Sequence, residues 1–300
     1  MTRDEMKIRA EGIRSQNLGD EFPASHHGYR AKAEVSEARV ETREGAGRVF
    51  LVRPKAGLKK TVPLYINIHG GGFVRQHTER DLLFCSMVAV ELGCLVMDID
   101  YKLAPEHPFP APQQECYDLV KWAVGNALAL GVDPTRVAVG GHSAGGNLAA
   151  SVALMANVTK EFSLKLQIID YACLDLASPP ESKPRDEYSM PLETMRLYDQ
   201  MCITREIDWF NPFLSPLRAP AAMLEGLTPA LIITAGRDCL RVDGEKYARL
   251  LEQAGVPVQY AHFAKSRHGF VVRGLDEWEA GSRRYLDALR QAFYGEGGEV

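Results

Sequence analysis

Two glycine-rich motifs constrain the fold of this chain more than any other feature of its sequence. The first, G-H-S-A-G at residues 141–145, follows an apolar stretch at 135–140 and precedes a helix-forming stretch at 147–155. This order predicts a strand, a sharp turn with Ser143 at its tip, and a helix, because the flanking glycines leave room for a strained backbone. A serine in such a turn is exposed beside the positive end of a helix, which is where a nucleophile is needed.

The second motif, H-G-G-G at residues 69–72, follows another apolar stretch at 63–68. Three successive glycines allow backbone amides to turn toward a bound molecule, although a flexible loop after a strand would have the same composition. Beside the serine turn, we interpret this loop as half of an oxyanion hole, a set of amides that stabilises negative charge on a reacting oxygen. The predicted donors are the amides of Gly71, Gly72 and Ala144.

The serine hydroxyl needs a base, because it is a poor nucleophile at neutral pH. In sites built on this turn, an acid and then a histidine follow the serine along the chain. Only two of the eight histidines, His262 and His268, lie beyond Ser143. His268 is the predicted base because it follows the strand-like stretch 258–263, whereas His262 lies within that stretch and is interpreted as structural.

The predicted acid is Asp238. It follows an apolar strand and leaves room for one helix and one strand before His268. Acidic groups at the carboxyl ends of parallel strands gather at the same edge of a sheet. Asp243 is the rival, although it lies inside the next expected helix, and Asp170 and Asp175 follow an earlier strand and are third choices.

These motifs resemble those of the hormone-sensitive-lipase-like branch of the α/β-hydrolase esterases. Three further segments carry the resemblance, which covers about residues 60–295: Y-K-L-A-P-E-H-P-F-P-A at 101–111, N-P-F-L-S-P-L at 211–217 and D-C-L-R-V-D-G at 238–244. The resemblance implies an α/β-hydrolase fold. It also implies a catalytic triad and an oxyanion hole made by Ser143, Asp238, His268, Gly71, Gly72 and Ala144.

Three positions depart from the family pattern. His142 stands where the family usually carries Asp, Lys102 where Arg is common, and Cys239 where Pro is common. None of these positions belongs to the triad. Because the side chain next to the nucleophile points elsewhere on the turn, His142 is not expected to be the base, although it places a second titratable group beside Ser143.

The rest of the chain alternates between strand and helix, which is typical of a mostly parallel sheet with helices on both faces. After a hairpin at 34–41 and 48–53, the expected strands are 63–69, 94–100, 135–140, 164–171, 229–235 and 258–263. The expected helices are 79–92, 112–129, 145–157, 243–254 and 275–294. The sequence shows no second domain and no repeat, so residues 1–300 are interpreted as a single α/β-hydrolase domain.

Two segments do not fit this alternation: residues 1–33, and residues 178–216 with a helix expected at 192–201. Long stretches of this kind usually form lids or binding loops. The resemblance implies that both segments build a helical cap over the site. The apolar side chains of the second segment are candidates for a substrate pocket or for packing of the cap onto the body: Met190, Leu197, Tyr198, Met201, Trp209, Phe210 and Phe213.

Composition excludes several classes of protein. The 300 residues are 46% hydrophobic and 25% charged, which is ordinary for a globular protein, and a net charge of −4 offers no basic surface for nucleic acid. The amino terminus carries no apolar signal segment and no stretch is long enough for a membrane span, so a cytoplasmic enzyme is expected. The six cysteines form no C-x-x-C pair, and no Cys/His spacing indicates a metal site.

Together these features predict a serine carboxylesterase that hydrolyses short-chain acyl esters through an acyl-enzyme intermediate, without a metal or cofactor. Two alternatives stay open: an aryl formamidase or amide hydrolase that uses the same triad, and a non-catalytic ligand receptor on the same fold. A dinucleotide-binding oxidoreductase is excluded because no G-x-G-x-x-G motif follows the first strand. Relatives in this family commonly pair through an edge strand, so a homodimer is a possible assembly.

Overall fold

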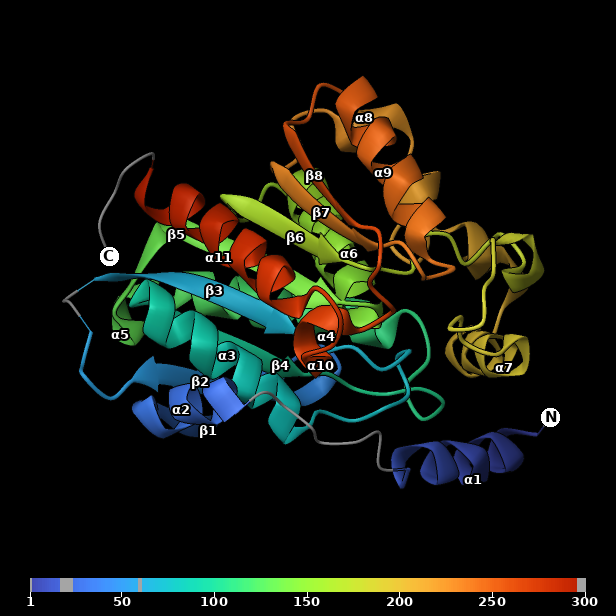
Figure 1. The fold of residues 1–300 in the computed structure, drawn as a ribbon, viewed down its shortest axis with the longest axis horizontal. Coiled ribbons are helices and arrows are strands. Elements are labelled where there is room, and N and C mark those ends of the chain that lie inside the picture. The colour runs from blue at the N-terminus through green and yellow to red at the C-terminus, as the bar shows by residue number, and fades with distance from the viewer. Residues whose placement is uncertain (1, 17–23, 59–60, 296–300) are drawn as a thin grey trace.

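An eight-stranded sheet with helices on both faces forms the body of the protein in the computed structural model, which describes residues 2–16, 24–58 and 61–295 (Figure 1). The strands are β1 (Ala33–Thr42), β2 (Gly45–Pro54), β3 (Val62–Ile68), β4 (Leu95–Asp100), β5 (Val132–His142), β6 (Leu166–Asp170), β7 (Ala230–Ala235) and β8 (Val258–Phe263). Their order in the sheet is β1-β2-β4-β3-β5-β6-β7-β8. The β1–β2 and β2–β4 pairs are antiparallel, and the other neighbouring strands pair in parallel.

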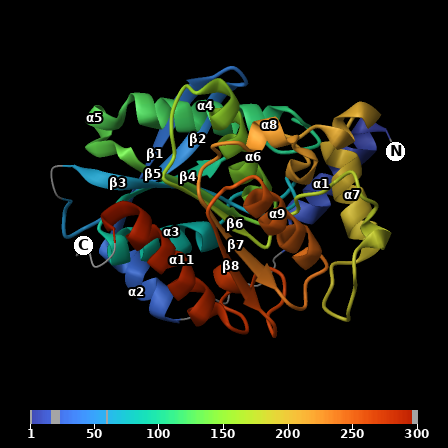
Figure 2. The same ribbon diagram turned by 90° about the horizontal axis from the view of Figure 1, so that it is seen from above.

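Helices cover the sheet in two layers (Figure 2). One layer is formed by α2 (Ala24–Lys32), α3 (Glu79–Leu92), α10 (Phe270–Arg273) and α11 (Trp278–Tyr294). The other is formed by α4 (Ala111–Gly125), α5 (Ala127–Leu130), α6 (Ala144–Thr159), α8 (Ala221–Leu224) and α9 (Arg241–Gln253). Two further helices, α1 (Arg3–Arg14) and α7 (Leu192–Cys202), lie at one end of the molecule.

The central strands are apolar because helices exclude water from both of their faces. Every residue of β3 and of β7 is buried, so neither strand alternates between apolar and polar residues. Successive side chains of a strand point to opposite faces. Tyr65 and Ile66 of β3 accordingly belong to two different apolar clusters, one on each side of the sheet. The sheet therefore separates two cores.

The structure confirms the fold class that the sequence predicted, and each expected strand is present. Two helix predictions were wrong in extent. The helix expected at 112–129 is divided between α4 and α5 because the chain leaves the helical path at Asn126, whose side-chain Nδ2 donates to the Trp122 carbonyl at 2.8 Å. The helix expected at 275–294 begins only at Trp278, because Asp276 has a positive φ of 52° that a right-handed helix excludes.

The carboxyl ends of β5, β7 and β8 lie along one edge of the sheet, because these strands run in parallel. Near this edge α1 and α7 lie at the same end of the molecule, although they are far apart in the sequence (Figures 1 and 2). Arg75 contacts both: its Nη1 donates to the Ile13 carbonyl at 2.7 Å, and its Nε donates to the Tyr198 hydroxyl at 3.1 Å. The later part of the segment 1–33, which was expected to join the cap, instead forms α2, and α2 packs against α3 of the body. Residues 17–23 of that segment lie outside the described residues.

Candidate active site

Ser143 occupies the tight turn between β5 and α6. Its φ of 57° and ψ of −116° lie in a region that residues with a side chain rarely adopt. The backbone amide of Ser143 donates to the Asp170 carbonyl at 2.9 Å, which ties the turn to the end of β6. A Cβ at Gly145 would overlap the carbonyl of Ile68, so only glycine allows α6 to approach β3 this closely. The local sequence therefore determines how the hydroxyl is presented.

His268 bridges Ser143 and Asp238. Its Nε2 lies 2.9 Å from the Ser143 Oγ, and its Nδ1 lies 2.6 Å from the Asp238 Oδ2. The second oxygen of Asp238 accepts a hydrogen bond from the Leu240 amide at 3.0 Å, which fixes the carboxylate. These distances form the serine–histidine–acid chain in which the acid orients the imidazole and the imidazole accepts the serine proton. The other histidine considered, His262, bonds Thr234 instead, at 3.0 Å.

The surroundings of His268 favour its charged form. Burial lowers the pKa of His268, but the charge of Asp238 and its hydrogen bond, together with the charge of Asp170, outweigh burial. Arg273 acts in the same direction as burial. The net result is a His268 pKa above the usual value for histidine. An imidazole that accepts a proton from serine must carry that charge during the reaction, so the surroundings match the role of a base.

The amides of Gly71, Gly72 and Ala144, predicted as oxyanion donors, belong to the two segments that meet at Ser143, since a Cβ at Gly70 would lie 3.5 Å from the Ser143 Cβ. Gly71 and Gly72 have positive φ angles of 120° and 62° in the turn after β3, and Ala144 is the first residue of α6. Within the described ranges, none of these three amides donates a hydrogen bond to another protein group. A Cβ at Gly72 would overlap the ring of Tyr198, so the loop and α7 are in direct contact. The three free amides can stabilise an oxyanion.

His142 points into the protein core. It is 1% exposed, and its Nδ1 lies 2.7 Å from the Oδ2 of Asp170. Its ring packs perpendicular to the ring of Phe84, with centroids 4.6 Å apart. Asp170, a third choice for the acid, therefore contacts His142 through its carboxylate, while Asp238 contacts His268.

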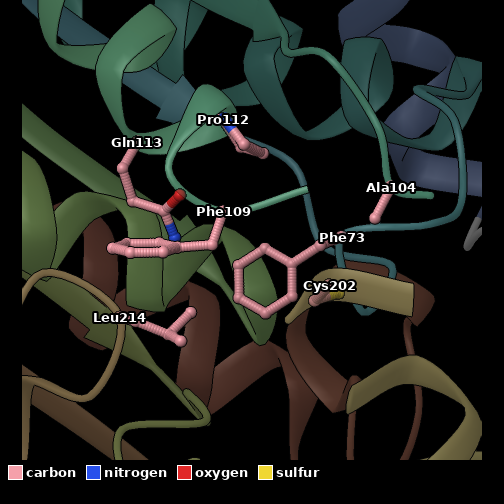
Figure 3. A pocket seen from close by; sticks show the side chains of 7 residues that line it. All are labelled: Phe73, Ala104, Phe109, Pro112, Gln113, Cys202 and Leu214. Carbon is pink, nitrogen blue, oxygen red and sulfur yellow. The ribbon is translucent and has the colours of Figure 1, made fainter. Parts of the chain in front are cut away.

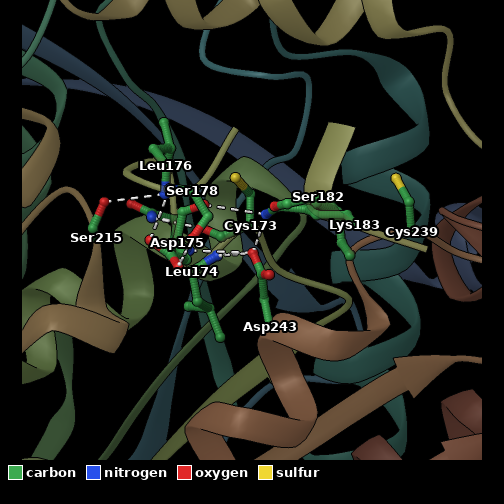
Figure 4. A network of polar contacts seen from close by, with 12 residues as sticks. Cys173, Leu174, Asp175, Leu176, Ser178, Ser182, Lys183, Ser215, Cys239 and Asp243 are labelled. Carbon is green, nitrogen blue, oxygen red and sulfur yellow. Dashed lines mark hydrogen bonds and ion pairs between the residues drawn. The ribbon is translucent and has the colours of Figure 1, made fainter. Parts of the chain in front are cut away.

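Asp243, the rival acid, belongs to a separate buried network (Figure 4). Its Oδ2 lies 2.5 Å from the Nζ of Lys183 and accepts hydrogen bonds from the amides of Leu174 and Asp175 at 3.1 and 3.2 Å. Both charged side chains are almost fully buried, 5% exposed for Lys183 and 3% for Asp243. The network holds the segment after β6 against the start of α9, so the observed contacts of Asp243 are structural. The sequence offered no local signal for Lys183 as its partner.

A narrow crevice lies next to the glycine loop (Figure 3). It is lined by Phe73, Ala104, Phe109, Pro112, Gln113, Cys202 and Leu214. Phe73 directly follows Gly72, and the Cys202 Sγ lies 3.6 Å from the Gly72 carbonyl oxygen, so the crevice adjoins the predicted amide donors. Gln113 is 2% exposed and its Oε1 has no hydrogen-bond partner among the described residues. Ala104, Phe109 and Leu214 lie in the segments 101–111 and 211–217 that carry the family resemblance, but the sequence did not predict that they meet, because the lining comes from four separate segments.

Five of the seven side chains predicted as candidates for a substrate pocket illustrate how different their environments are. Tyr198 and Met201 of α7 are buried, and Tyr198 lies against the glycine loop. Trp209 and Phe213 are partly buried and pack against the main apolar cluster. Phe210 is 60% exposed, and its ring lies 5.9 Å from the Arg218 guanidinium. None of the five lines the crevice described above.

The described part of the chain contains no group of three or more His, Cys, Asp or Glu side chains arranged to hold a metal ion. Among the helices that the structure describes, none has the length and apolar character needed to cross a membrane. The chemistry available to the site is nucleophilic attack by Ser143, proton transfer through His268, and stabilisation of an oxyanion by backbone amides.

Comparison with known proteins points to the same chemistry. The family model for the alpha/beta hydrolase fold matches residues 65–272. An arylesterase from Saccharolobus solfataricus is 34% identical over 210 residues, which are 69% of this chain and 68% of the relative. An ethyl acetate hydrolase from Pseudomonas putida is 33% identical over 266 residues, 86% of this chain and 82% of the relative. The solved structure of a hyperthermophilic esterase from Pyrobaculum calidifontis has a TM-score of 0.80 at 32% identity, covering 96% of this chain and 92% of that one.

The contacts of the two acids predict different effects when each is changed to the amide. Asp238→Asn would favour the wrong tautomer of His268, so reaction of Ser143 with a fluorophosphonate probe should slow by about 10³–10⁴-fold. Asp243→Asn would leave Lys183 buried without its anion and should lower the free energy of unfolding by about 3–5 kcal/mol. The probe rate of the folded Asp243→Asn protein should stay within roughly tenfold of wild type. Labelling kinetics and denaturant unfolding measure the two effects, and a reversed pattern would reassign the acid.

Proposed function

We propose that this chain, which belongs to the hormone-sensitive-lipase-like carboxylesterases of the alpha/beta hydrolase fold family, is a serine carboxylesterase in which Ser143, His268 and Asp238 carry out catalysis. The observation that supports the proposal best is the continuous set of contacts from the Ser143 Oγ through His268 to Asp238, at 2.9 and 2.6 Å. Relatives named as an arylesterase and an ethyl acetate hydrolase support carboxylic esters as the substrate class.

The mechanism follows from these contacts. His268 accepts the Ser143 proton through Nε2 while Ser143 Oγ attacks the ester carbonyl carbon. The carbonyl oxygen becomes negatively charged and is stabilised by the free amides of the glycine loop and of Ala144. Loss of one such donor typically costs about 3–4 kcal/mol of transition-state stabilisation. His268 then protonates the leaving alcohol, and water repeats the sequence on the acyl-enzyme to release the acid and regenerate Ser143.

We infer that the substrates have short acyl chains. The contact of Tyr198 with Gly72 brings α7 over the glycine loop, and the crevice that adjoins this loop is narrow. A site enclosed in this way suits small esters better than long, aggregated lipids. We assign α1 and α7, within residues 1–33 and 178–216, to the cap that encloses it.

The amide-hydrolase alternative would use the same atoms, and no contact in the site favours it over ester hydrolysis. A non-catalytic receptor would not need the His268–Ser143 contact at 2.9 Å. The single domain, the cytoplasmic location and the homodimer stay predictions from the sequence.

Replacement of the nucleophile tests the proposal most directly. Ser143→Ala should fold with an unchanged unfolding temperature, yet hydrolysis of p-nitrophenyl acetate should fall by roughly 10⁴–10⁶-fold, because the remaining groups cannot form the acyl-enzyme. A fluorophosphonate probe should label the wild-type protein once, at Ser143, as peptide mass spectrometry would show. Labelling at a different serine, or turnover that survives the substitution, would refute the assignment.

The enclosed site predicts a limit on acyl length. Across a series of p-nitrophenyl esters, kcat/KM should be highest within about two to eight carbons and fall for longer chains, because a closed pocket cannot accommodate them. The same series should show no jump in rate above the critical micelle concentration. Activity that climbs steadily to sixteen-carbon esters (C16, a palmitate) would contradict a closed acyl site.

The pH dependence follows from the raised pKa of His268. Only the neutral imidazole accepts the Ser143 proton, so kcat/KM should rise with pH as His268 loses its proton. Because the pKa of His268 is raised, the midpoint of this acid limb should lie above the ordinary histidine value of about 6.5. A profile on p-nitrophenyl acetate, corrected for spontaneous hydrolysis, locates the midpoint. A midpoint clearly below that value would show that burial outweighs the charge of Asp238.

A further inference from the structure

A second histidine–carboxylate pair lies directly behind the nucleophile. The Nδ1 of His142 lies 2.7 Å from the Oδ2 of Asp170, and the two side chains are 2% and 0% exposed. Aromatic rings surround the His142 imidazole: Phe84 and Tyr285 have ring centroids at 4.6 and 5.6 Å from it. Neither member of this pair belongs to the triad, and a buried polar pair of this kind is costly unless its hydrogen bond is made.

Asp170 also holds the nucleophile through its backbone. Its carbonyl accepts the Ser143 amide at 2.9 Å, while its carboxylate contacts the ring of His142. His142 and Asp170 are direct partners in the parallel β5–β6 register, so these contacts join the last residue of each strand. His142, which precedes Ser143, and Asp170, which accepts the Ser143 amide, are therefore connected both by their side-chain hydrogen bond and by the pairing of β5 with β6. This arrangement resists rotation of the strained turn at Ser143.

The unpaired atoms of the pair indicate where its proton lies. The Nε2 of His142 and the Oδ1 of Asp170 are buried without hydrogen-bond partners among the described residues. A proton on both ring nitrogens would leave the Nε2–H group buried and unpaired, which these surroundings disfavour. A proton on Nδ1 that bonds the Asp170 carboxylate leaves Nε2 as a bare acceptor. With Asp170 ionised, the pair then carries one net negative charge; burial raises the pKa of the Asp170 carboxyl, and the hydrogen bond of His142 opposes that effect.

Tyr171 contacts both the catalytic histidine and the His142–Asp170 pair. Its ring packs edge-on against His268, with centroids 5.1 Å apart, and its hydroxyl lies 3.3 Å from the Nδ1 of His142. The groups that act on His268 are Asp238 and Asp170, which raise its pKa, and Arg273, which lowers it. Asp170 is thus a second carboxylate that raises the pKa of His268, and Tyr171 contacts both the catalytic ring and the His142–Asp170 pair.

We propose that His142 and Asp170 act as a positioning pair: they hold the Ser143 turn, and their net negative charge stabilises the His268 imidazolium that forms during the reaction. The inference rests on the proposed function for its kinetic readout. It gives a role to the residue that stands in place of the aspartate common in the family. The proposal distinguishes two effects of the pair. Hydrogen bonds hold the Ser143 turn in place, and the negative charge stabilises the His268 imidazolium.

Asp170→Asn tests the charge while keeping the size of the side chain. Loss of the negative charge should move the acid limb of kcat/KM to lower pH by roughly half a unit to one unit. At a pH above both midpoints, kcat/KM should fall by no more than the roughly three- to tenfold that corresponds to this shift, because the imidazolium formed in the reaction loses the same stabilisation. If the pair were only structural, kcat would fall equally at every pH and the limb would stay in place, which would overturn the proposal.

The matched control is a second buried pair, His77 and Asp98. The Nε2 of His77 lies 2.6 Å from the Asp98 Oδ2, and the side chains are 7% and 0% exposed. Asp98 also accepts a hydrogen bond from Asn67 at 2.8 Å, and the pair neighbours His69 rather than His268. Asp98→Asn should therefore leave the acid limb at the wild-type pH. An equal shift in both variants would show that any buried carboxylate has this effect, which would refute a specific role for Asp170.

Asp170→Asn could fail to fold, so a second variant removes the pair as a unit. The double substitution His142→Phe and Asp170→Leu places apolar side chains in the aromatic surroundings of Phe84 and Tyr285, and such replacements of buried pairs are often tolerated. It should shift the acid limb in the same direction as Asp170→Asn. A limb that stays at the wild-type pH in the folded double variant would also overturn the proposal.

A direct titration separates this inference from the proposed function. Nuclear magnetic resonance of the His268 imidazole, with His268→Gln for assignment, measures its pKa without any substrate. A lower His268 pKa in Asp170→Asn would support the inference. If the wild-type protein nevertheless hydrolysed no ester, only the proposed function would be refuted. If the wild-type protein hydrolyses esters but the His268 pKa is unchanged in Asp170→Asn, the inference is refuted and the proposed function stands.

Discussion

The backbone of Ser143, held at φ 57° and ψ −116°, is the constraint on which the rest of the site depends. A side-chain-bearing residue in a sparsely populated conformation costs on the order of 1–3 kcal/mol and persists only where its surroundings fix it. Here the surroundings are the paired ladders of β5 with β3 and β6, the start of α6, and the hydrogen bond from the Ser143 amide to Asp170. The strain is therefore offset by the most deeply buried part of the sheet.

The other members of the site depend on the same sheet. Asp238 follows β7 and His268 follows β8, and these strands run parallel to β5, so their carboxyl ends bring three distant segments together. A change in the spacing of the strands would move all three side chains relative to one another. Hydrogen-bond distances of 2.6 and 2.9 Å at His268 are thus a property of the sheet as much as of the residues concerned.

The parts of the site that the sequence predicts are those governed by local rules. A glycine-flanked serine after a strand specifies its own turn, and a histidine or an aspartate just past a strand end is placed at the same edge by the parallel arrangement. The same rule favours Asp238, which lies just past β7, over Asp243, which lies inside α9. The central fold class followed from apolar stretches and their spacing for the same reason.

The parts that the sequence does not predict depend on contacts across the fold. The pairing of His142 with Asp170 requires the register of β5 against β6, and the ion pair of Lys183 with Asp243 joins a loop to a helix. The break between α4 and α5 depends on one Asn side chain that bonds the preceding turn. No periodicity in the chain encodes such partners.

Arg75 connects the glycine loop to both helices, α1 and α7, at the end of the molecule. It lies on the turn that begins at the glycine loop, and it contacts the carboxyl-terminal end of α1 through Ile13 and the middle of α7 through Tyr198. Tyr198 in turn lies against Gly72, one of the amides beside the nucleophile. A ligand that touched either helix, away from the reacting bond, would therefore be linked through Arg75 and Tyr198 to the loop that carries these amides. Binding energy from a remote part of the ligand can be spent on ordering the groups that stabilise the transition state.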